Sequence, residues 1–160
     1  MVKPLHNRPA SATLTDSREL LEGLFELGVL LTGRMDAGLA EQGLTRARAE
    51  VLWNLLRQPG ATQRELSQAL RCTPRNVTDL VDALEASGLV ARGPHPTDRR
   101  ATLVRLTRRG QSEVARMQAG SQSLAATLFA EVPPQELAAF GTVLEQVILR
   151  LRQAARLMSR

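Results

Sequence analysis

Five polar side chains lie close together in the sequence and carry the hydrogen-bonding groups needed to recognise a nucleic-acid base. These residues are Thr73, Arg75, Asn76, Thr78 and Asp79. An Arg guanidinium can pair with O6 and N7 of guanine, and an Asn amide with N6 and N7 of adenine, each worth about 1–3 kcal/mol of discrimination. The two threonines suit contacts to phosphate or methyl groups, whereas Asp79 suits cytosine or could orient Arg75. We treat all five as candidate DNA contacts, with an ordinary solvated helix face as the alternative for each.

A second charged group follows in a stretch that cannot be helical. Segment 92–100 contains two prolines and a glycine, which exclude a helix and favour a loop between paired strands. Its candidate DNA contacts are Arg92, Asp98, Arg99 and Arg100. A rigid planar cation such as the Arg side chain suits the negative potential of a narrow minor groove. The loop is therefore a second candidate DNA-binding element.

The positive charge of the chain is concentrated in the same region. The formal net charge is +5, and 20 of the 21 basic residues are Arg. Residues 71–109 hold eight Arg and four acidic residues, so this segment carries +4 and the remainder only +1. A concentrated basic element is typical of a phosphate-binding face, although a solvated basic surface is the alternative. The coincidence with the loop favours DNA binding.

Two short helices are predicted to present the first group of side chains. Thr62 and Glu65 form a capping-box pattern at the start of one helix. Thr73 is a good N-cap for the next helix, with Pro74 at its first position, and Gly88 should end it. The buried face of this second helix follows the spacing i, i+3, i+4 and i+7, with Val77, Leu80, Val81 and Leu84. Two helices joined by about three residues form a helix-turn-helix, whose second helix is the expected reader of the major groove.

Two extended runs follow the helices and are expected to pair as a ribbon. Residues 89–91 form one run and residues 102–106 the other, with the basic loop between them. A β-ribbon beside a helix-turn-helix is a winged helix. The fold expected from these signals is thus mainly α with a small β-wing, namely a winged helix-turn-helix.

In the helix-turn-helix and the ribbon, the sequence resembles the MarR family of bacterial transcription regulators. The resemblance covers three stretches, Val77-Thr-Asp-Leu-Val-Asp-Ala-Leu-Glu-Ala-Ser-Gly-Leu-Val-Ala-Arg92, Asp98-Arg-Arg100 and Val104-Arg-Leu-Thr-Arg-Arg-Gly110. By this resemblance Arg100 enters the minor groove and Asp98 holds its guanidinium in place. Arg92 and Arg99 are then expected to contact the DNA backbone.

The resemblance also implies a small aromatic effector, because family members commonly bind such compounds between the dimer helices and the DNA-binding lobe. Aromatic residues make up only 2% of this chain. The candidates for lining a cleft are Phe25, Met35 and Trp53. Trp53 has an alternative as a partly buried packing residue.

Both ends of the chain carry long apolar stripes. The first region repeats Leu20, Leu24, Leu27, Leu31, Met35 and Leu39. The last region repeats Leu137, Phe140, Leu144, Val147, Leu151, Ala154 and Met158. Such regularity predicts a helix packed along another helix. The family resemblance favours a homodimer, which makes the expected fold a winged helix-turn-helix with N- and C-terminal dimerisation helices. A helix folded back on its own domain is the alternative.

These observations divide the chain into functional regions. Residues 1–15 are predicted to be a flexible arm. Residues 16–43 and 110–160 form the helical dimerisation region, and residues 44–109 form the winged helix-turn-helix DNA-binding lobe. The partners expected are double-stranded DNA and a second copy of the chain.

Other classes of function find little support in the sequence. No catalytic residue, cofactor or metal site is predicted, because there is no glycine-rich phosphate loop and no cluster of Cys and His, so the protein is not expected to be an enzyme. Cys72, the single cysteine, is interpreted as a small turn residue. A redox role, which the nearby Arg71 and Arg75 would favour, is the alternative. No membrane span and no secretory signal are found, and the expected location is the cytoplasm. The resemblance implies that a DNA-binding regulator of this kind is a repressor. The alternative function is a winged-helix protein-interaction module.

Overall fold

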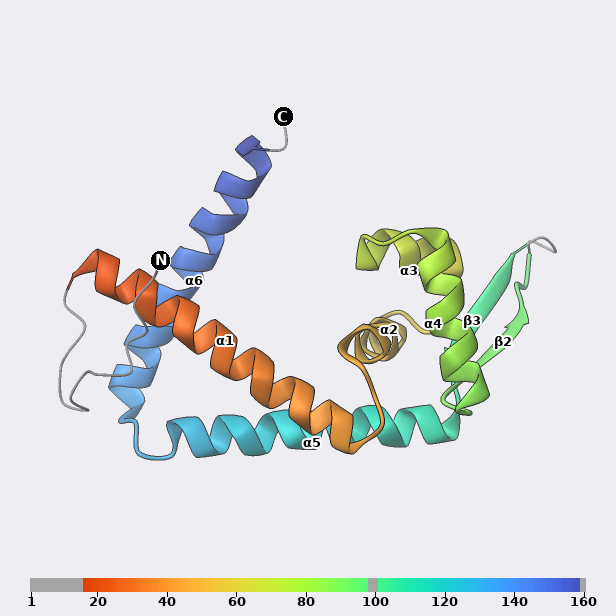
Figure 1. The fold of residues 1–160 in the computed structure, drawn as a ribbon, viewed down its shortest axis with the longest axis horizontal. Helices are drawn as coiled ribbons and strands as arrows, with labels where there is room; N and C mark the ends of the chain where they lie inside the picture. The colour runs from red at the N-terminus through yellow and green to blue at the C-terminus, as the bar shows by residue number, and fades with distance from the viewer. Residues whose placement is uncertain (1–15, 98–100, 159–160) are drawn as a thin grey trace. The chain divides into compact units, whose positions relative to one another are not determined.

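The computed structural model describes residues 16–97 and 101–158. In these ranges the elements are α1 (Ser17–Glu41), α2 (Arg46–Arg57), β1 (Ala61–Thr62), α3 (Gln63–Leu70), α4 (Pro74–Ala86), β2 (Val90–Pro94), β3 (Thr102–Leu106), α5 (Arg108–Phe129) and α6 (Pro134–Met158) (Figure 1). The expected mainly α fold with a small β-wing is therefore confirmed. The chain divides within α5 into two compact units, the first ending at Met117 and the second beginning at Gln118.

The helix-turn-helix forms where the capping residues predicted it. Thr62 Oγ1 accepts from the Glu65 backbone N–H at 3.2 Å, and Glu65 Oε2 accepts from the Thr62 backbone N–H at 2.7 Å. This reciprocal capping box starts α3. Thr73 caps α4 by accepting from the Asn76 backbone N–H at 3.3 Å. Gly88 follows the end of α4 at φ +69°, a conformation that costs glycine little.

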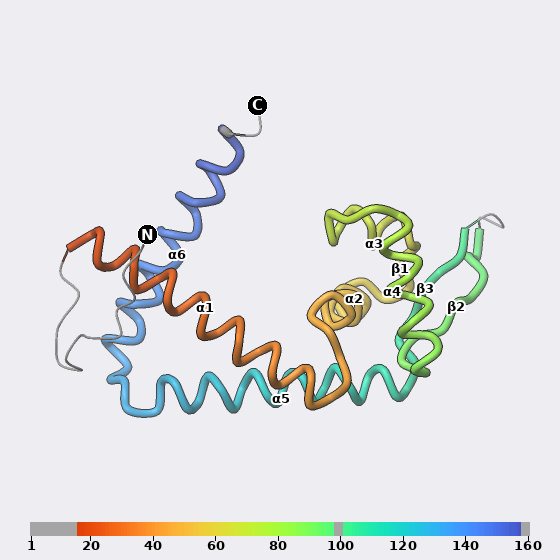
Figure 2. The backbone as a smooth tube through the Cα atoms, viewed as in Figure 1, coloured from red at the N-terminus to blue at the C-terminus, as the bar shows by residue number. Residues whose placement is uncertain are grey.

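The wing contains one strand more than the predicted ribbon. The antiparallel sheet has the order β1-β3-β2, so the two-residue strand β1 lies on the other side of β3 from β2 (Figure 2). Ala61 pairs with Val104 on one side, and Arg92 pairs with the same residue on the other. The central strand therefore joins the wing to the residues that immediately precede α3.

A single apolar core holds these elements in place. Its fully buried side chains come from α2, α3, α4, the sheet and the first part of α5, and include Val51, Leu52, Leu55, Leu66, Val77, Val81, Leu84, Val90, Val104 and Val114. The buried face of α4 matches the predicted one except that Leu80 is only partly buried. Burial of this face fixes which side chains of α4 point outward.

The terminal helices differ from this lobe because they keep uncovered apolar side chains. No residue of α1 is buried, and Phe25 and Val29 are 64% and 72% exposed. None of the described side chains of α6, from Pro134 to Leu157, is buried either, and Leu151 is 64% exposed. Within the described ranges, these helices are not long and apolar enough to cross a membrane.

Candidate nucleic-acid interface

The outer face of α4 presents most of the first predicted group of contacts. Arg75, Asn76 and Asp79 are exposed on the first half of the helix, opposite the buried face. Thr73 is exposed as well, and its side chain forms the cap of the first turn. The N-terminal end of a helix also carries a partial positive charge that favours phosphate. These four residues form one outward-facing polar surface.

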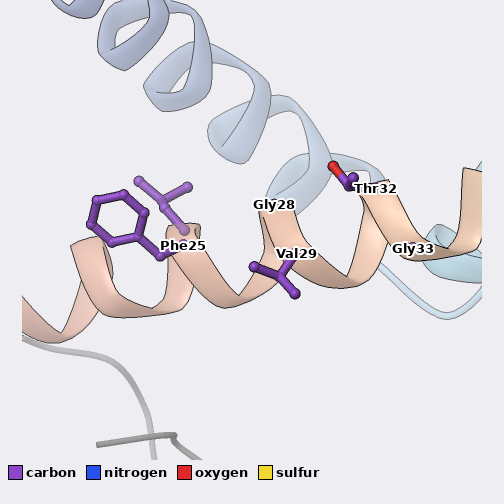
Figure 3. A pocket seen from close by; sticks show the side chains of 6 residues that line it. Phe25, Gly28, Val29, Thr32 and Gly33 are labelled. Atoms are coloured by element: carbon purple, nitrogen blue, oxygen red, sulfur yellow. The ribbon is translucent and has the colours of Figure 1, made fainter. Parts of the chain in front are cut away.

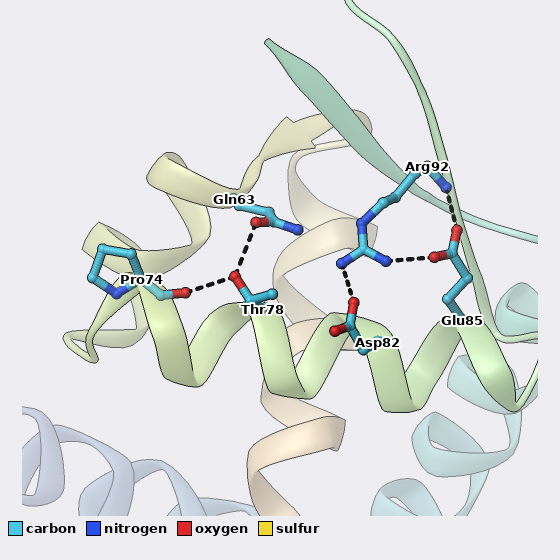
Figure 4. Close-up of polar contacts among 6 residues, drawn as sticks. All are labelled: Gln63, Pro74, Thr78, Asp82, Glu85 and Arg92. Atoms are coloured by element: carbon cyan, nitrogen blue, oxygen red, sulfur yellow. Dashed lines mark hydrogen bonds and ion pairs between the residues drawn. The ribbon is translucent and has the colours of Figure 1, made fainter.

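Thr78 lies apart from this surface. Its side chain is partly buried and faces α3, and Oγ1 donates to the Pro74 backbone oxygen at 3.0 Å (Figure 4). Thr78 Oγ1 also lies 3.2 Å from the side-chain amide of Gln63. The hydroxyl is therefore engaged at the contact between α3 and α4.

Arg92 also makes contacts within the chain that its predicted role did not include. Its Nη2 lies 2.5 Å from Asp82 Oδ1, and its Nη1 pairs with Glu85 Oε2. The Arg92 backbone N–H donates to the other oxygen of Glu85 at 3.0 Å. The side chain thus points from β2 toward α4 (Figure 4) and is only 25% exposed.

The amide of Gln63 connects Arg92 to Thr78. The single hydroxyl proton of Thr78 is donated to Pro74, so the end of the amide that faces Thr78 must be its NH2 group. With its oxygen and nitrogen exchanged relative to Figure 4, Gln63 donates to Thr78 Oγ1 at 3.2 Å. Its oxygen then accepts from Nη2 and Nε of Arg92 at 2.9 and 3.2 Å. We call Arg92, Asp82, Glu85 and Gln63 the Arg92 cluster.

The Arg92 cluster affects the ionisation of Glu85. The backbone N–H of Arg92, and after it the guanidinium, hold the pKa of Glu85 below its ordinary value. Glu85 is therefore ionised at neutral pH and serves as the anionic partner of Arg92. Sequence reasoning did not select Gln63, Asp82 or Glu85, because their contacts depend on how β2 packs against α4. The sequence did contain one signal for these contacts, namely two acidic residues three positions apart on α4 followed by an Arg in a strand.

The tip of the wing carries the remaining predicted contacts. Asp98, Arg99 and Arg100 lie outside the described residues. The strands that flank them are paired as far as Pro94 and Thr102. The roles expected for these three side chains remain predictions.

The residues predicted to line an effector cleft are not brought together. Phe25 lines a shallow apolar depression along α1, together with Leu24, Gly28, Val29, Thr32 and Gly33 (Figure 3). Met35 and Trp53 are not part of this depression. Trp53 is instead partly buried against the core of the lobe.

The helix-turn-helix and the three-stranded wing define the class of protein as a winged helix-turn-helix. A sequence profile of the MarR family matches residues 42–101. The transcriptional repressor Mb2911 of Mycobacterium bovis is 28% identical over 134 residues, which cover 84% of this chain and 96% of the relative.

Solved structures extend the similarity beyond the matched segment. A MarR family protein from Bacillus stearothermophilus is 25% identical with a TM-score of 0.75, covering 87% of this chain and 99% of that one. Streptococcus pneumoniae FabT in complex with DNA has the same fold, with 18% identity and a TM-score of 0.77 over 86% of this chain and 99% of that one. In both sequence and fold the chain is thus similar to the MarR family of winged helix-turn-helix transcription regulators, which is not a family of enzymes.

Proposed function

We propose that this protein is a transcriptional repressor that binds a specific double-stranded DNA site. The observation that carries the proposal is the outer face of α4, where Arg75 and Asn76 are exposed while the opposite face is locked into the core. In a major groove these two side chains would read base edges, with Asp79 beside them and Thr73 near the phosphates. The repressor Mb2911 and the DNA complex of FabT support this function by similarity.

We further propose that Arg100 at the wing tip enters the minor groove, with Asp98 holding its guanidinium and Arg99 at the DNA backbone. Arg100→Ala should weaken binding to most sequences and lower the salt slope by about 0.9 per wing, because a phosphate-neutralising cation is lost. The measurement is titration against matched and scrambled duplexes at several salt concentrations. An unchanged affinity and salt slope would contradict this role of the wing.

A homodimer is proposed because the terminal helices leave apolar side chains uncovered. Residues 16–43 and 110–160 would then form the dimerisation region, and residues 44–109 the DNA-binding lobe. Leu151 lies on the predicted stripe and is 64% exposed in the single chain. Leu151→Asp should therefore shift the protein toward monomer in analytical ultracentrifugation, whereas Gln153→Asp, off the stripe on the same helix, should not. A Leu151→Asp protein that remains fully dimeric would argue against this interface.

A two-fold dimer sets the form of the DNA site. Its two copies of α4 would lie in successive major grooves about 34 Å apart, so the site should be an inverted repeat with half-sites about one turn apart. The experiment is selection of bound duplexes from a random pool. If no inverted repeat is enriched, the protein would be better explained as a winged-helix module that binds other proteins.

An effector is the last part of the proposed function. The apolar depression on α1 has Phe25 in its lining, which suits the ring of a small aromatic compound. A panel of small aromatic acids should contain compounds that release the protein from its selected duplex. Phe25→Ala should weaken this response without changing DNA affinity in the absence of the compound. An equal response in both proteins would place the effector elsewhere.

A further inference from the structure

We propose that Arg92 is a positioning residue for DNA binding, which locks the base of the wing to the recognition helix α4 instead of contacting DNA itself. The inference rests on the proposed function, in which α4 and the wing bind neighbouring grooves of one site. It changes the expected role of Arg92, whose side chain was predicted to contact the DNA backbone.

The hydrogen-bonding capacity of Arg92 is largely used within the chain. A guanidinium has five N–H groups. Nε donates to Gln63, Nη2 donates to both Gln63 and Asp82, and Nη1 donates to Glu85. Four of these five N–H groups can therefore be assigned to partners in the Arg92 cluster. A phosphate could bind well only after several of these bonds had been broken.

The charges around Arg92 also disfavour a contact with phosphate. One guanidinium lies between two carboxylates, so Arg92, Asp82 and Glu85 together carry a formal charge of −1. A phosphate approaching this group would meet repulsion from the carboxylates as well as attraction from the cation. Hydrogen bonds between a guanidinium and a carboxylate are stronger than those between neutral groups, because both partners are ionised. The arrangement therefore suits a fixed internal connection better than a DNA contact.

The residues of the Arg92 cluster also lie where the wing meets the helix-turn-helix. Arg92 lies at the middle of β2, which pairs with β3 from Val90 to Pro94. Asp82 follows Asp79 by about one helical turn on α4, so the cluster begins next to the proposed base-reading surface. Gln63 adds the first residue of α3 to the same connection. One planar side chain thus joins the wing to both helices of the helix-turn-helix (Figure 4).

A fixed connection of this kind should make the two DNA contacts cooperate. Once α4 has bound its groove, a locked wing is already held near the flanking DNA and loses little further freedom on binding. Without this connection, the wing would have to be ordered during binding to the DNA. Loss of the Arg92 cluster should therefore remove the part of the binding affinity that comes from the flanking DNA. The part that comes from α4 should remain.

The experiment compares two duplexes built on the inverted repeat recovered by selection. One duplex keeps the base pairs that flank the half-sites, and the other ends at the half-sites. The full-length protein should bind the flanked duplex more tightly. In Arg92→Gln and Glu85→Gln, binding to the flanked duplex should be roughly tenfold weaker, while binding to the trimmed duplex should change little. The double variant should be no worse than Arg92→Gln alone, because both changes break one connection.

Arg57→Gln provides the matched control, since it removes one positive charge at an exposed site outside the cluster. Its ratio of affinities for the two duplexes should equal that of the unmodified protein. The trimmed duplex also tests folding, because a misfolded variant would lose binding to both duplexes. Arg92→Lys separates charge from shape: it keeps the cation but cannot form the planar fork, so it should resemble Arg92→Gln.

The outcomes distinguish the inference from the proposed function. If the unmodified protein binds both duplexes equally, the proposed wing contact is wrong and the inference falls with it. If the unmodified protein prefers the flanked duplex and Glu85→Gln keeps that preference, the wing contact stands and only the positioning role is refuted. Tighter binding of the flanked duplex by Glu85→Gln, with a steeper salt dependence, would show instead that the acids restrain Arg92 from contacting phosphate.

Discussion

An added methyl group at Gly110, in the first turn of α5, should disturb the fold. A Cβ atom there would overlap the backbone carbonyl oxygen of Leu89 and lie 3.0 Å from its carbonyl carbon. Because the obstacle is backbone, it cannot rotate away, and α5 must move from the start of β2. That movement would also strain the bond from the Gly110 backbone N–H to Thr107 Oγ1, which is 3.0 Å long.

The size of the effect follows from two opposing contributions. Overpacking in a closely packed core destabilises by about 1–3 kcal/mol, and overlap with backbone belongs at the upper end. Replacing glycine by alanine inside a helix contributes about 1 kcal/mol in the other direction. Gly110→Ala should therefore lower the free energy of unfolding by about 2 kcal/mol. For a chain of this length that corresponds to a Tm lower by about 4–8 °C.

The assay is thermal or urea unfolding followed by circular dichroism, at one fixed protein concentration. Gly120→Ala is the matched control, because it makes the same substitution in the same helix at a site where an added Cβ would meet no atom within 4 Å. It should stabilise the protein by up to about 1 kcal/mol. A Gly110→Ala protein as stable as Gly120→Ala would refute the reasoning, since the close contact with Leu89 could not then be rigid.

Three further outcomes are expected. Arg75→Ala should cost about 1–3 kcal/mol of binding to the selected duplex and relax the preference at one position in each half-site, as measured by repeated selection. The Thr62 backbone N–H, followed by its hydroxyl, lowers the pKa of Glu65 in the folded chain. As the pH falls, the Glu65 carboxylate is therefore protonated in the unfolded chain before it is protonated in the folded chain. The stabilisation by Glu65 should therefore be complete at neutral pH and lost as the pH falls through its folded pKa, so the stabilities of wild type and Glu65→Gln, measured in urea, should converge in acid. Cys72→Ser should leave DNA binding and its response to peroxide unchanged; loss of binding on oxidation in the wild type alone would contradict this.

The helix-turn-helix could be predicted because its signals are local. Thr62, Thr73 and Gly88 each act on backbone groups within a few residues, and the structure places all three in the predicted roles. The strand β1 could not be predicted in the same way. A two-residue strand has no alternation to detect, and it exists only because β3 offers it a partner.

The candidate site depended more on tertiary contacts. The pattern of α4 indicated which face is buried, and so correctly placed Arg75 and Asn76 on the outside. The same pattern could not show that Thr78 faces Gln63, or that Arg92 reaches back to Asp82, because these pairs are brought together by packing of α3, α4 and β2. Arg92 was predicted to contact DNA because it is a basic residue in the proline-containing segment. In the structure it pairs with Asp82 and Glu85 of α4 instead.

The position of Thr62 has a consequence for hydrogen exchange in the wing. Thr62 is both the last residue of β1, paired with Leu103, and the N-cap of α3. The edge strand β2 can fray from β3 while the pairing of β1 with β3 survives. Detaching β3, however, removes the partner of Thr62 and loosens the first turn of α3. The backbone amides of β3 and of that first turn should therefore become accessible to solvent deuterium in one shared opening event, slower than the opening of β2.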